Sequence, residues 1–306
     1  MQYYTLSFNQ LLTEIDVFID RILNDNMNAD ETALVLNNLY PEMKCYYDHR
    51  LTYTETVKWF IDTCGISDTE YSSSETEWDS ESVDRFIYKI KKYLPEYLQS
   101  RKKFVLEEKR ITKSLNTYLN ELIDHYARLL FVRVDLHYRV DYQDGDGIDS
   151  FDYYMTRFKQ HMSNKKGCFK GLEGYAWSFE QGYQGSCGLH CHLLLAYNGE
   201  KHEEGEAFGE MVGEKWMSFI DGQGHYFNCN DKNYVNRFER LEIRGVGRIH
   251  RKNETEVQNA IKTLSYLTTK KDKYEQRLKA KLPGMRTFGH GTYRNTKRRG
   301  LPPITK

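Results

Sequence analysis

The sequence predicts an α+β protein in which a helical N-terminal region precedes a domain built on a mostly antiparallel sheet. A change in the spacing of apolar residues leads to this prediction. They recur every three to four positions over roughly the first 125 residues, and from about residue 130 they alternate with polar residues. With 306 residues, 39% of them apolar, the chain is long enough to bury a core as one large domain or two smaller ones.

The N-terminal region has the apolar spacing of amphipathic helices at residues 11–23, 36–40 and 56–64. Residues 65–84 are acidic and rich in serine, and they predict a solvated linker. Helical spacing returns at residues 82–99 and 113–130. The predicted organisation is a helical N-terminal region at residues 1–125, a domain at residues 126–290 and a basic C-terminal tail at residues 291–306.

The second half of the chain has four segments whose residues alternate as in strands with one buried face, at residues 131–140, 171–180, 189–197 and 241–250. A helix is predicted over residues 253–272. Asn253 has the position of an N-cap, and Glu254 and Glu256 lie in the first turn, where acidic side chains are favourable. This half is therefore expected to be α+β with a mostly antiparallel sheet.

Charge is balanced overall but segregated along the chain. Lys and Arg together number 44, as do Asp and Glu. From residue 269 to the last residue there are twelve basic residues and two acidic ones, which gives that segment about ten positive charges. A nucleic-acid partner explains this footprint, and so does a solvated basic tail. The candidate phosphate contacts in the tail are Arg294, Lys297, Arg298 and Arg299.

The sequence has no long apolar run, no secretory signal and no transit peptide, so we expect a cytoplasmic protein without a membrane partner. Six scattered cysteines predict reduced thiols rather than a disulfide framework.

Two histidines, His190 and His192, are one residue apart on a predicted strand and therefore project from the same face. If the preceding strand pairs with this one as a hairpin, Glu180 lies nearly opposite His190. Two imidazoles and one carboxylate suit a divalent cation and leave positions open for water and substrate. Two alternatives are histidines with a purely structural role and a zinc site, which would draw on the neighbouring Cys187, Cys191, His225 and Cys229.

Tyr266 is the second candidate for chemistry. On the helix predicted at residues 253–272 it points away from the apolar stripe, towards Lys262, Lys270 and Lys273. A tyrosine among lysines can approach a phosphate, and cations or a metal would help its hydroxyl to act as a nucleophile. The alternative is an ordinary surface tyrosine.

Asp135 lies on the polar face of the first strand together with Arg133. A structural ion pair between the two explains this placement. The alternative is that Asp135 supports a histidine of the metal site.

These residues and motifs together resemble the HUH endonucleases, which comprise rolling-circle replication initiators and relaxases. More narrowly, the segments RVDLHY, GLHCHLLLAYNG, YLTTKKD and MRTFG look like the inovirus gene II-type replication proteins and their prophage-encoded YfjJ-like relatives. The resemblance covers roughly residues 126–290. It implies a five-stranded antiparallel sheet, flanked by helices, with the histidine pair on a central strand.

The resemblance also implies an activity. Glu180, His190 and His192 would hold Mg²⁺ or Mn²⁺, Tyr266 would attack a DNA phosphate, and Lys270 would stabilise the phenolate or the phosphate. The protein would then be a sequence-specific nickase and strand transferase that forms a 5′-phosphotyrosine. It would initiate rolling-circle replication of a phage, satellite or plasmid at a single-stranded origin, with a host helicase or polymerase as a further partner. Some relatives use two tyrosines, and Tyr274 is the second candidate here.

Two departures from the family pattern keep alternatives open. The residue between the histidines is Cys191 rather than a bulkier hydrophobe, and Tyr266 and Lys270 are four residues apart rather than three. A prophage DNA-binding protein that keeps the HUH fold but nicks weakly or not at all is one alternative. A metal-dependent hydrolase in which water is the nucleophile is the other.

Overall fold

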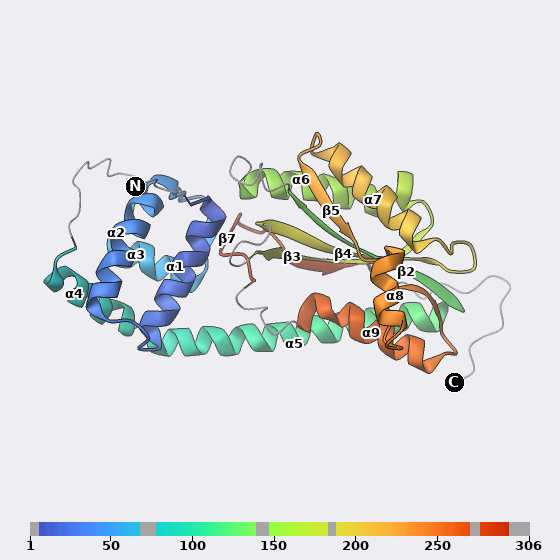
Figure 1. The fold of residues 1–306 in the computed structure, drawn as a ribbon, viewed down its shortest axis with the longest axis horizontal. Coiled ribbons are helices and arrows are strands. Elements are labelled where there is room, and N and C mark those ends of the chain that lie inside the picture. The colour runs from blue at the N-terminus through green and yellow to red at the C-terminus, as the bar shows by residue number, and fades with distance from the viewer. Residues whose placement is uncertain (1–5, 68–77, 139–146, 183–187, 270–275, 294–306) are drawn as a thin grey trace.

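The computed structural model of the protein describes residues 6–67, 78–138, 147–182, 188–269 and 276–293. It confirms the α+β class, because N-terminal helices precede a mainly antiparallel sheet that is packed between helices (Figure 1).

Four helices form an N-terminal bundle: α1 (Phe8–Leu23), α2 (Ala29–Tyr46), α3 (Glu55–Cys64) and α4 (Ser80–Lys91). Apolar residues at helical spacing on α1 are fully buried against the other helices, which is why this segment is helical. Helix α4 begins inside the segment at residues 65–84 that was predicted to be a linker. Asp79 caps it, since its carboxylate accepts the backbone N–H of Ser82 at 2.8 Å, so the linker prediction is wrong at its C-terminal end.

Helix α5 (Leu94–His125) runs from the bundle to the sheet (Figure 1). Its second half buries Leu115, Tyr118, Leu119 and Leu122 under the sheet. Although α5 is long, neither it nor any other helix among the described residues is apolar enough along its length to span a membrane.

The main sheet has strands β2 (Arg128–Tyr138), β3 (Leu172–Gln181), β4 (Leu189–Asn198), β5 (Gly224–Asn228), β6 (Gly247–His250) and β8 (Phe288–His290). Their order is β5-β2-β4-β3-β8, every pairing is antiparallel, and β4 is the central strand of this path. Over the described residues the sheet has one strand more than the expected five, because β2 is long enough to pair with β5 near its end and with β6 near its beginning.

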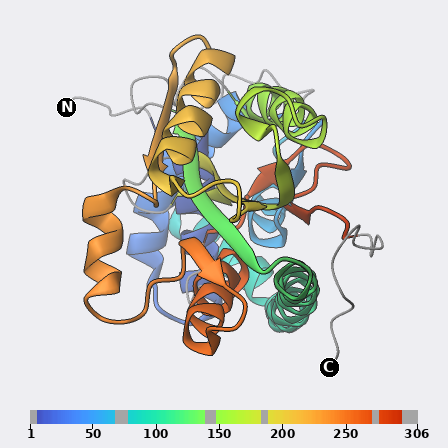
Figure 2. The ribbon, with the colours of Figure 1, turned by 90° about the vertical axis from the view of Figure 1, so that its right-hand side faces the viewer.

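Each face of the sheet is covered by its own pair of helices (Figure 2). Helices α6 (Ile148–Ser163) and α7 (Gly205–Phe219) pack on one face, where Cys191, Leu193 and Leu195 of β4 are buried. Helices α5 and α9 (Glu254–Thr269) pack on the other, where Leu194 and Ala196 are buried. His190 and His192 project from this second face, beyond its apolar part, as the alternation predicts.

The prediction of a strand at residues 241–250 is wrong for its first six residues. Helix α8 (Lys232–Glu239) ends just before this segment, and the backbone then turns, with Glu242 in the left-handed region at φ 57°. Only Gly247–His250 pairs with β2. The helix predicted at residues 253–272 is confirmed as far as Thr269, the last described residue before the gap, and Asn253 caps it by accepting the N–H of Glu256 at 3.3 Å.

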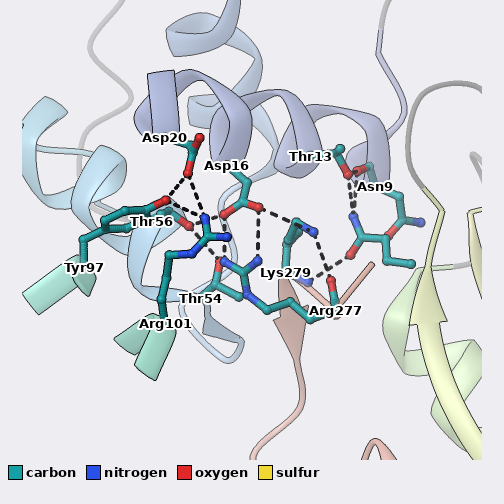
Figure 3. A network of polar contacts seen from close by, with 11 residues as sticks. Asn9, Thr13, Asp16, Asp20, Thr54, Thr56, Tyr97, Arg101, Arg277 and Lys279 are labelled. Atoms are coloured by element: carbon teal, nitrogen blue, oxygen red, sulfur yellow. Dashed lines mark hydrogen bonds and ion pairs between the residues drawn. The ribbon is translucent and has the colours of Figure 1, made fainter. Parts of the chain in front are cut away.

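The bundle meets the sheet domain through a buried polar network (Figure 3). A two-stranded sheet joins β1 (Thr52–Tyr53) to β7 (Ala280–Lys281). Beside it, Asp16 of α1 pairs with Arg277 at 2.9 Å and with the fully buried Lys279 at 3.5 Å. Gln181, the last residue of β3, donates its side-chain amide to the carbonyl of Asn9 at 2.8 Å. The bundle therefore touches the sheet at the residue next to Glu180.

Candidate metal centre

Glu180, His190 and His192 come together on adjacent strands. The register of the hairpin places Glu180 directly opposite His190, as the sequence predicts, and Ser178 opposite His192. Glu180 Oε2 lies 3.2 Å from Nε2 of His192 and 3.7 Å from Nε2 of His190. One ligand atom from each of the three residues lies within 4.8 Å of the others. Among the residues that the structure describes, no second group of histidine, cysteine, aspartate or glutamate has this geometry.

The three side chains fit a divalent cation. Glu180 is fully buried and His192 is nearly so, while His190 keeps 14% of its side chain exposed. A buried carboxylate needs compensating positive charge or hydrogen bonds, and a cation held between it and two imidazoles would supply that charge. Imidazole together with carboxylate suits several divalent metals, so these residues form a possible metal site without fixing which metal it takes.

Hydrogen bonds on the far side of each ring aim both histidines at Glu180. His190 Nδ1 donates to the carbonyl of Gly188 at 3.2 Å. His192 Nδ1 lies 2.7 Å from Asp135 Oδ1. With Nδ1 as the donor, each ring presents Nε2 as an acceptor, which is the arrangement that metal-binding histidines commonly show.

Asp135 takes both of the roles considered for it. Besides its contact with His192, its Oδ2 lies 3.0 Å from Nη2 of Arg133, and both side chains are largely buried. Burial alone would raise the pKa of Asp135, but the charge of Arg133 and the contact with His192 outweigh it and hold that pKa well below its ordinary value. Burial opposes the charge of Arg133 too, yet Asp135 raises the pKa of the guanidinium above its ordinary value. Asp135 is therefore an anion beside His192.

A row of histidines extends across the sheet from His190. His137 of β2 lies opposite both His190 and His225 of β5. Burial, followed by the nearby imidazoles of His190 and His225, lowers the pKa of His137 to about 4. His137 is thus a neutral side chain beside the candidate site. His137 alternates with the buried residues of β2 and so shares the polar face with Asp135, but no local pattern predicts the strand order that brings it beside His190.

Among the residues that the structure describes, the cysteines do not support a zinc site. Cys191 is fully buried on the opposite face of the sheet, among apolar side chains. Burial raises the pKa of the thiols of Cys191 and Cys229, in the case of Cys229 to about 12. A raised pKa opposes the thiolate form that zinc requires. Cys187 lies outside the described residues.

Tyr266 lies on the exposed side of α9, as predicted, with 46% of its surface accessible. Its ring contacts Arg133, whose guanidinium carbon is 5.7 Å from the ring centroid. Arg133 Nη2 is in turn 3.3 Å from Nδ1 of His192. Arg133, whose place on the strand predicts only a pairing with Asp135, therefore connects Tyr266 to the candidate metal site. Lys262 is exposed on the same helix and lines a cavity together with Tyr266.

The remaining predicted site residues lie outside the described residues. They are Lys270, Lys273, Tyr274, Arg294, Lys297, Arg298 and Arg299.

Comparison with protein families identifies a match to the YagK/YfjJ C-terminal domain over residues 89–291. This range takes in the whole of α5, the whole main sheet, the three candidate metal ligands and Tyr266. Comparison with curated proteins gives no match, and neither does comparison with solved structures. Because the match spans about two thirds of the chain and the complete sheet, the protein belongs to the YagK/YfjJ C-terminal domain family.

Proposed function

We propose that the protein is a metal-dependent endonuclease that nicks single-stranded DNA and joins the cut strand to Tyr266, to initiate rolling-circle replication of a phage, satellite or plasmid. One observation carries the proposal: the ligand atoms of Glu180, His190 and His192 lie on the face of the sheet that Tyr266 also overlies, and Arg133 contacts both His192 and Tyr266. A metal group, a cation and a tyrosine are the parts that transfer of a phosphodiester to tyrosine requires.

The reaction is an exchange of one ester for another. Tyr266 Oη attacks the scissile phosphorus, and the bond from phosphorus to the 3′ oxygen breaks. The phenol proton ends on the released 3′ oxygen, so the products are a 5′-phosphotyrosine and a free 3′-hydroxyl that can prime synthesis. Mg²⁺ or Mn²⁺ held by Glu180, His190 and His192 would polarise the phosphate and offset its growing negative charge.

The other residues position and stabilise the reacting groups. Arg133 is held by Asp135 with only 12% of its side chain exposed, so its charge is fixed in place beside Tyr266. A fixed charge in a largely buried site stabilises developing negative charge more than a solvated one does. Lys262, one turn away on α9, adds a second positive charge at the edge of the site. Lys270 would act in the same way.

The proposal is tested by incubating the full chain and Mn²⁺ with labelled single-stranded oligonucleotides that tile the DNA around its own gene. We expect a protein–DNA adduct on a denaturing gel that EDTA abolishes. Tyr266→Phe should bind the same oligonucleotide with unchanged affinity and form no adduct. Tyr88→Phe, which alters a tyrosine that is 64% exposed on α4, should behave as the unmodified chain does.

The two alternatives give different results in this experiment. Binding without cleavage, in the unmodified chain as well as in the Tyr266 variant, contradicts the nickase and supports a DNA-binding protein without catalysis. Cleavage that persists in Tyr266→Phe without an adduct contradicts tyrosine as the nucleophile and supports hydrolysis by water.

A further inference from the structure

A cavity of about 390 Å³ lies beside the candidate metal site, between β2, α8 and α9. Arg133 and Tyr266 both line it. The cavity therefore begins at the two residues that connect the metal group to the proposed nucleophile. Its volume is within the range of pockets that bind small organic groups.

Aromatic side chains form much of its wall. Tyr234 and Phe238 are one turn apart on α8, their ring centroids are 5.0 Å apart, and both line the cavity together with Tyr266. No residue of α8 is fully buried, although the helix carries these two aromatic rings. Phe227 of β5 packs edge-on against Tyr234 at 4.9 Å and supports it from the side of the sheet. Half-exposed rings on a helix that contributes nothing to the core are available to stack on a flat ligand.

The rest of the lining combines apolar and cationic groups. Val235, Ile243 and Val246 add apolar surface. Arg133, Arg244 and Lys262 bring positive charge. Among the residues that the structure describes, Asp135 pairs with Arg133 at 3.0 Å and Glu239 of α8 pairs with Arg244 at 3.3 Å, while Lys262 is exposed. Flat aromatic walls beside cations match a nucleotide, in which a planar base is joined to an anionic phosphate.

We propose that this cavity binds one nucleobase of the DNA strand, taken from the nucleotide next to the phosphate that Tyr266 attacks. This inference rests on the proposed function. It gives a role to the aromatic residues of α8, which the proposed cleavage reaction does not use. The base stacks against Tyr234 and Phe238 while Arg133 and Lys262 face its phosphate. Holding one base out of the strand fixes the position of the neighbouring phosphate relative to Tyr266.

Photocross-linking locates the base directly. The full chain is mixed in EDTA, so that no cleavage takes place, with a pool of random single-stranded 20-mers in which 5-iododeoxyuridine replaces thymidine. Irradiation joins that base to aromatic side chains in contact with it, and mass spectrometry maps the linked peptides. We expect cross-links on α8, at Tyr234 or Phe238. Cross-links that lie only outside α8 and α9 would overturn the proposal.

Affinity provides the second measurement. Removing one stacking ring should weaken binding of the same pool roughly 5- to 100-fold, so we expect that loss for Phe238→Ala. Tyr153→Ala is the matched control, because Tyr153 is 55% exposed on α6, on the opposite face of the sheet, and should leave affinity unchanged. Circular dichroism verifies that both variants are folded.

The outcomes separate this proposal from the proposed function. An EDTA-sensitive adduct together with unchanged affinity in Phe238→Ala overturns the base pocket and leaves the nickase standing. Cross-links at α8 without any adduct support the pocket and contradict the nickase. A chain that binds no oligonucleotide contradicts both.

Discussion

The imidazole ring of His192 lies between two carboxylates, with one ring nitrogen near each. Nδ1 is 2.7 Å from Asp135 and Nε2 is 3.2 Å from Glu180. Asp135 fixes the tautomer and the orientation of the ring, so Nε2 keeps its lone pair for a cation. Arg133 holds Asp135 from the other side. At the scale of single residues, the candidate metal site therefore extends beyond the three side chains that could hold a cation.

Asp135→Asn should lower the affinity for Mn²⁺ about 10- to 100-fold, because the ring of His192 loses the anion that orients it. Isothermal titration calorimetry on the folded variant measures this. Arg133→Lys is the matched control, since it keeps a positive charge beside Asp135 and should change the affinity much less. Equal affinity in Asp135→Asn and the unmodified chain would show that Asp135 does not support the site.

A cation that binds only the folded protein should raise the unfolding temperature. We expect Mn²⁺ to raise it for the unmodified chain and not for His192→Gln. His225→Gln alters a histidine outside the ligand group and should keep the increase. Thermal unfolding with and without 1 mM EDTA provides the comparison. An equal increase for all three proteins would place the cation elsewhere.

The sequence was sufficient to predict that Glu180, His190 and His192 come together, but it did not predict which residues surround them. The period of two put His190 and His192 on one face, and a short hairpin loop put Glu180 opposite, because hairpin register follows from local spacing. The contact of Arg133 with Tyr266 joins residues far apart in the chain and depends on how α9 packs across β2. Local patterns carry no information about such a contact.

At the scale of elements, helix α7 packs unusually close to β5. Gly209 and Gly213 face the strand, and a Cβ on either would overlap Asn228 or the ring of Tyr226. Asn228 cannot easily move, because its side chain donates to the carbonyl of Glu206 at 2.9 Å and accepts the N–H of Asn230 at 3.0 Å. This packing positions the edge of the sheet from which α8 follows.

Gly209→Ala should therefore destabilise the protein by about 1–3 kcal/mol, although alanine stabilises a helix by about 1 kcal/mol relative to glycine. Glu210→Ala, at the neighbouring exposed position of α7, should change stability by less than about 0.5 kcal/mol. Urea unfolding measures both. A Gly209→Ala protein as stable as the unmodified chain would mean that α7 can move away from β5 without cost.

Elements with a strong local pattern were predicted, and weaker ones were not. Strand β4 alternates clearly, and helix α9 has a clear helical period and an N-cap. By contrast, β5 has only five residues and is a strand because it pairs with β2, and β8 has only three and is a strand because it pairs with β3. The segment at residues 241–246 alternates like a strand, yet α8 and the turn at Glu242 keep it out of the sheet. Tertiary context decides such segments.

At the scale of the whole molecule, the N-terminal bundle contacts the end of the main sheet, which carries the candidate metal site. Asp16 contacts Arg277 and the fully buried Lys279, which lie shortly after α9, and Gln181 reaches α1 next to Glu180 (Figure 3). The bundle thus contacts both the residue next to Glu180 and the segment that holds Arg277 and Lys279. Asp16 and Arg277 are 261 positions apart, so no sequence pattern could have predicted this junction.

Asp16→Ala leaves buried cations without their anion and should cost about 3–5 kcal/mol. Asp20→Ala, one turn further along α1, removes an ion pair whose two side chains are each 40% exposed and a hydrogen bond from Tyr97, and it should cost less, about 1–2 kcal/mol. Urea unfolding followed by circular dichroism compares the two. Equal losses would contradict the idea that the buried junction joins the bundle to the sheet.

The central claim is that Tyr266 receives the DNA strand beside a metal held by Glu180, His190 and His192. It is tested most directly by digesting the adduct formed with Mn²⁺ and mapping the nucleotide-bearing peptide by mass spectrometry. The account predicts the peptide from Thr263 to Lys270, with the phosphate on its only tyrosine, Tyr266. A phosphate on any other tyrosine, or cleaved DNA without a modified peptide, would contradict it.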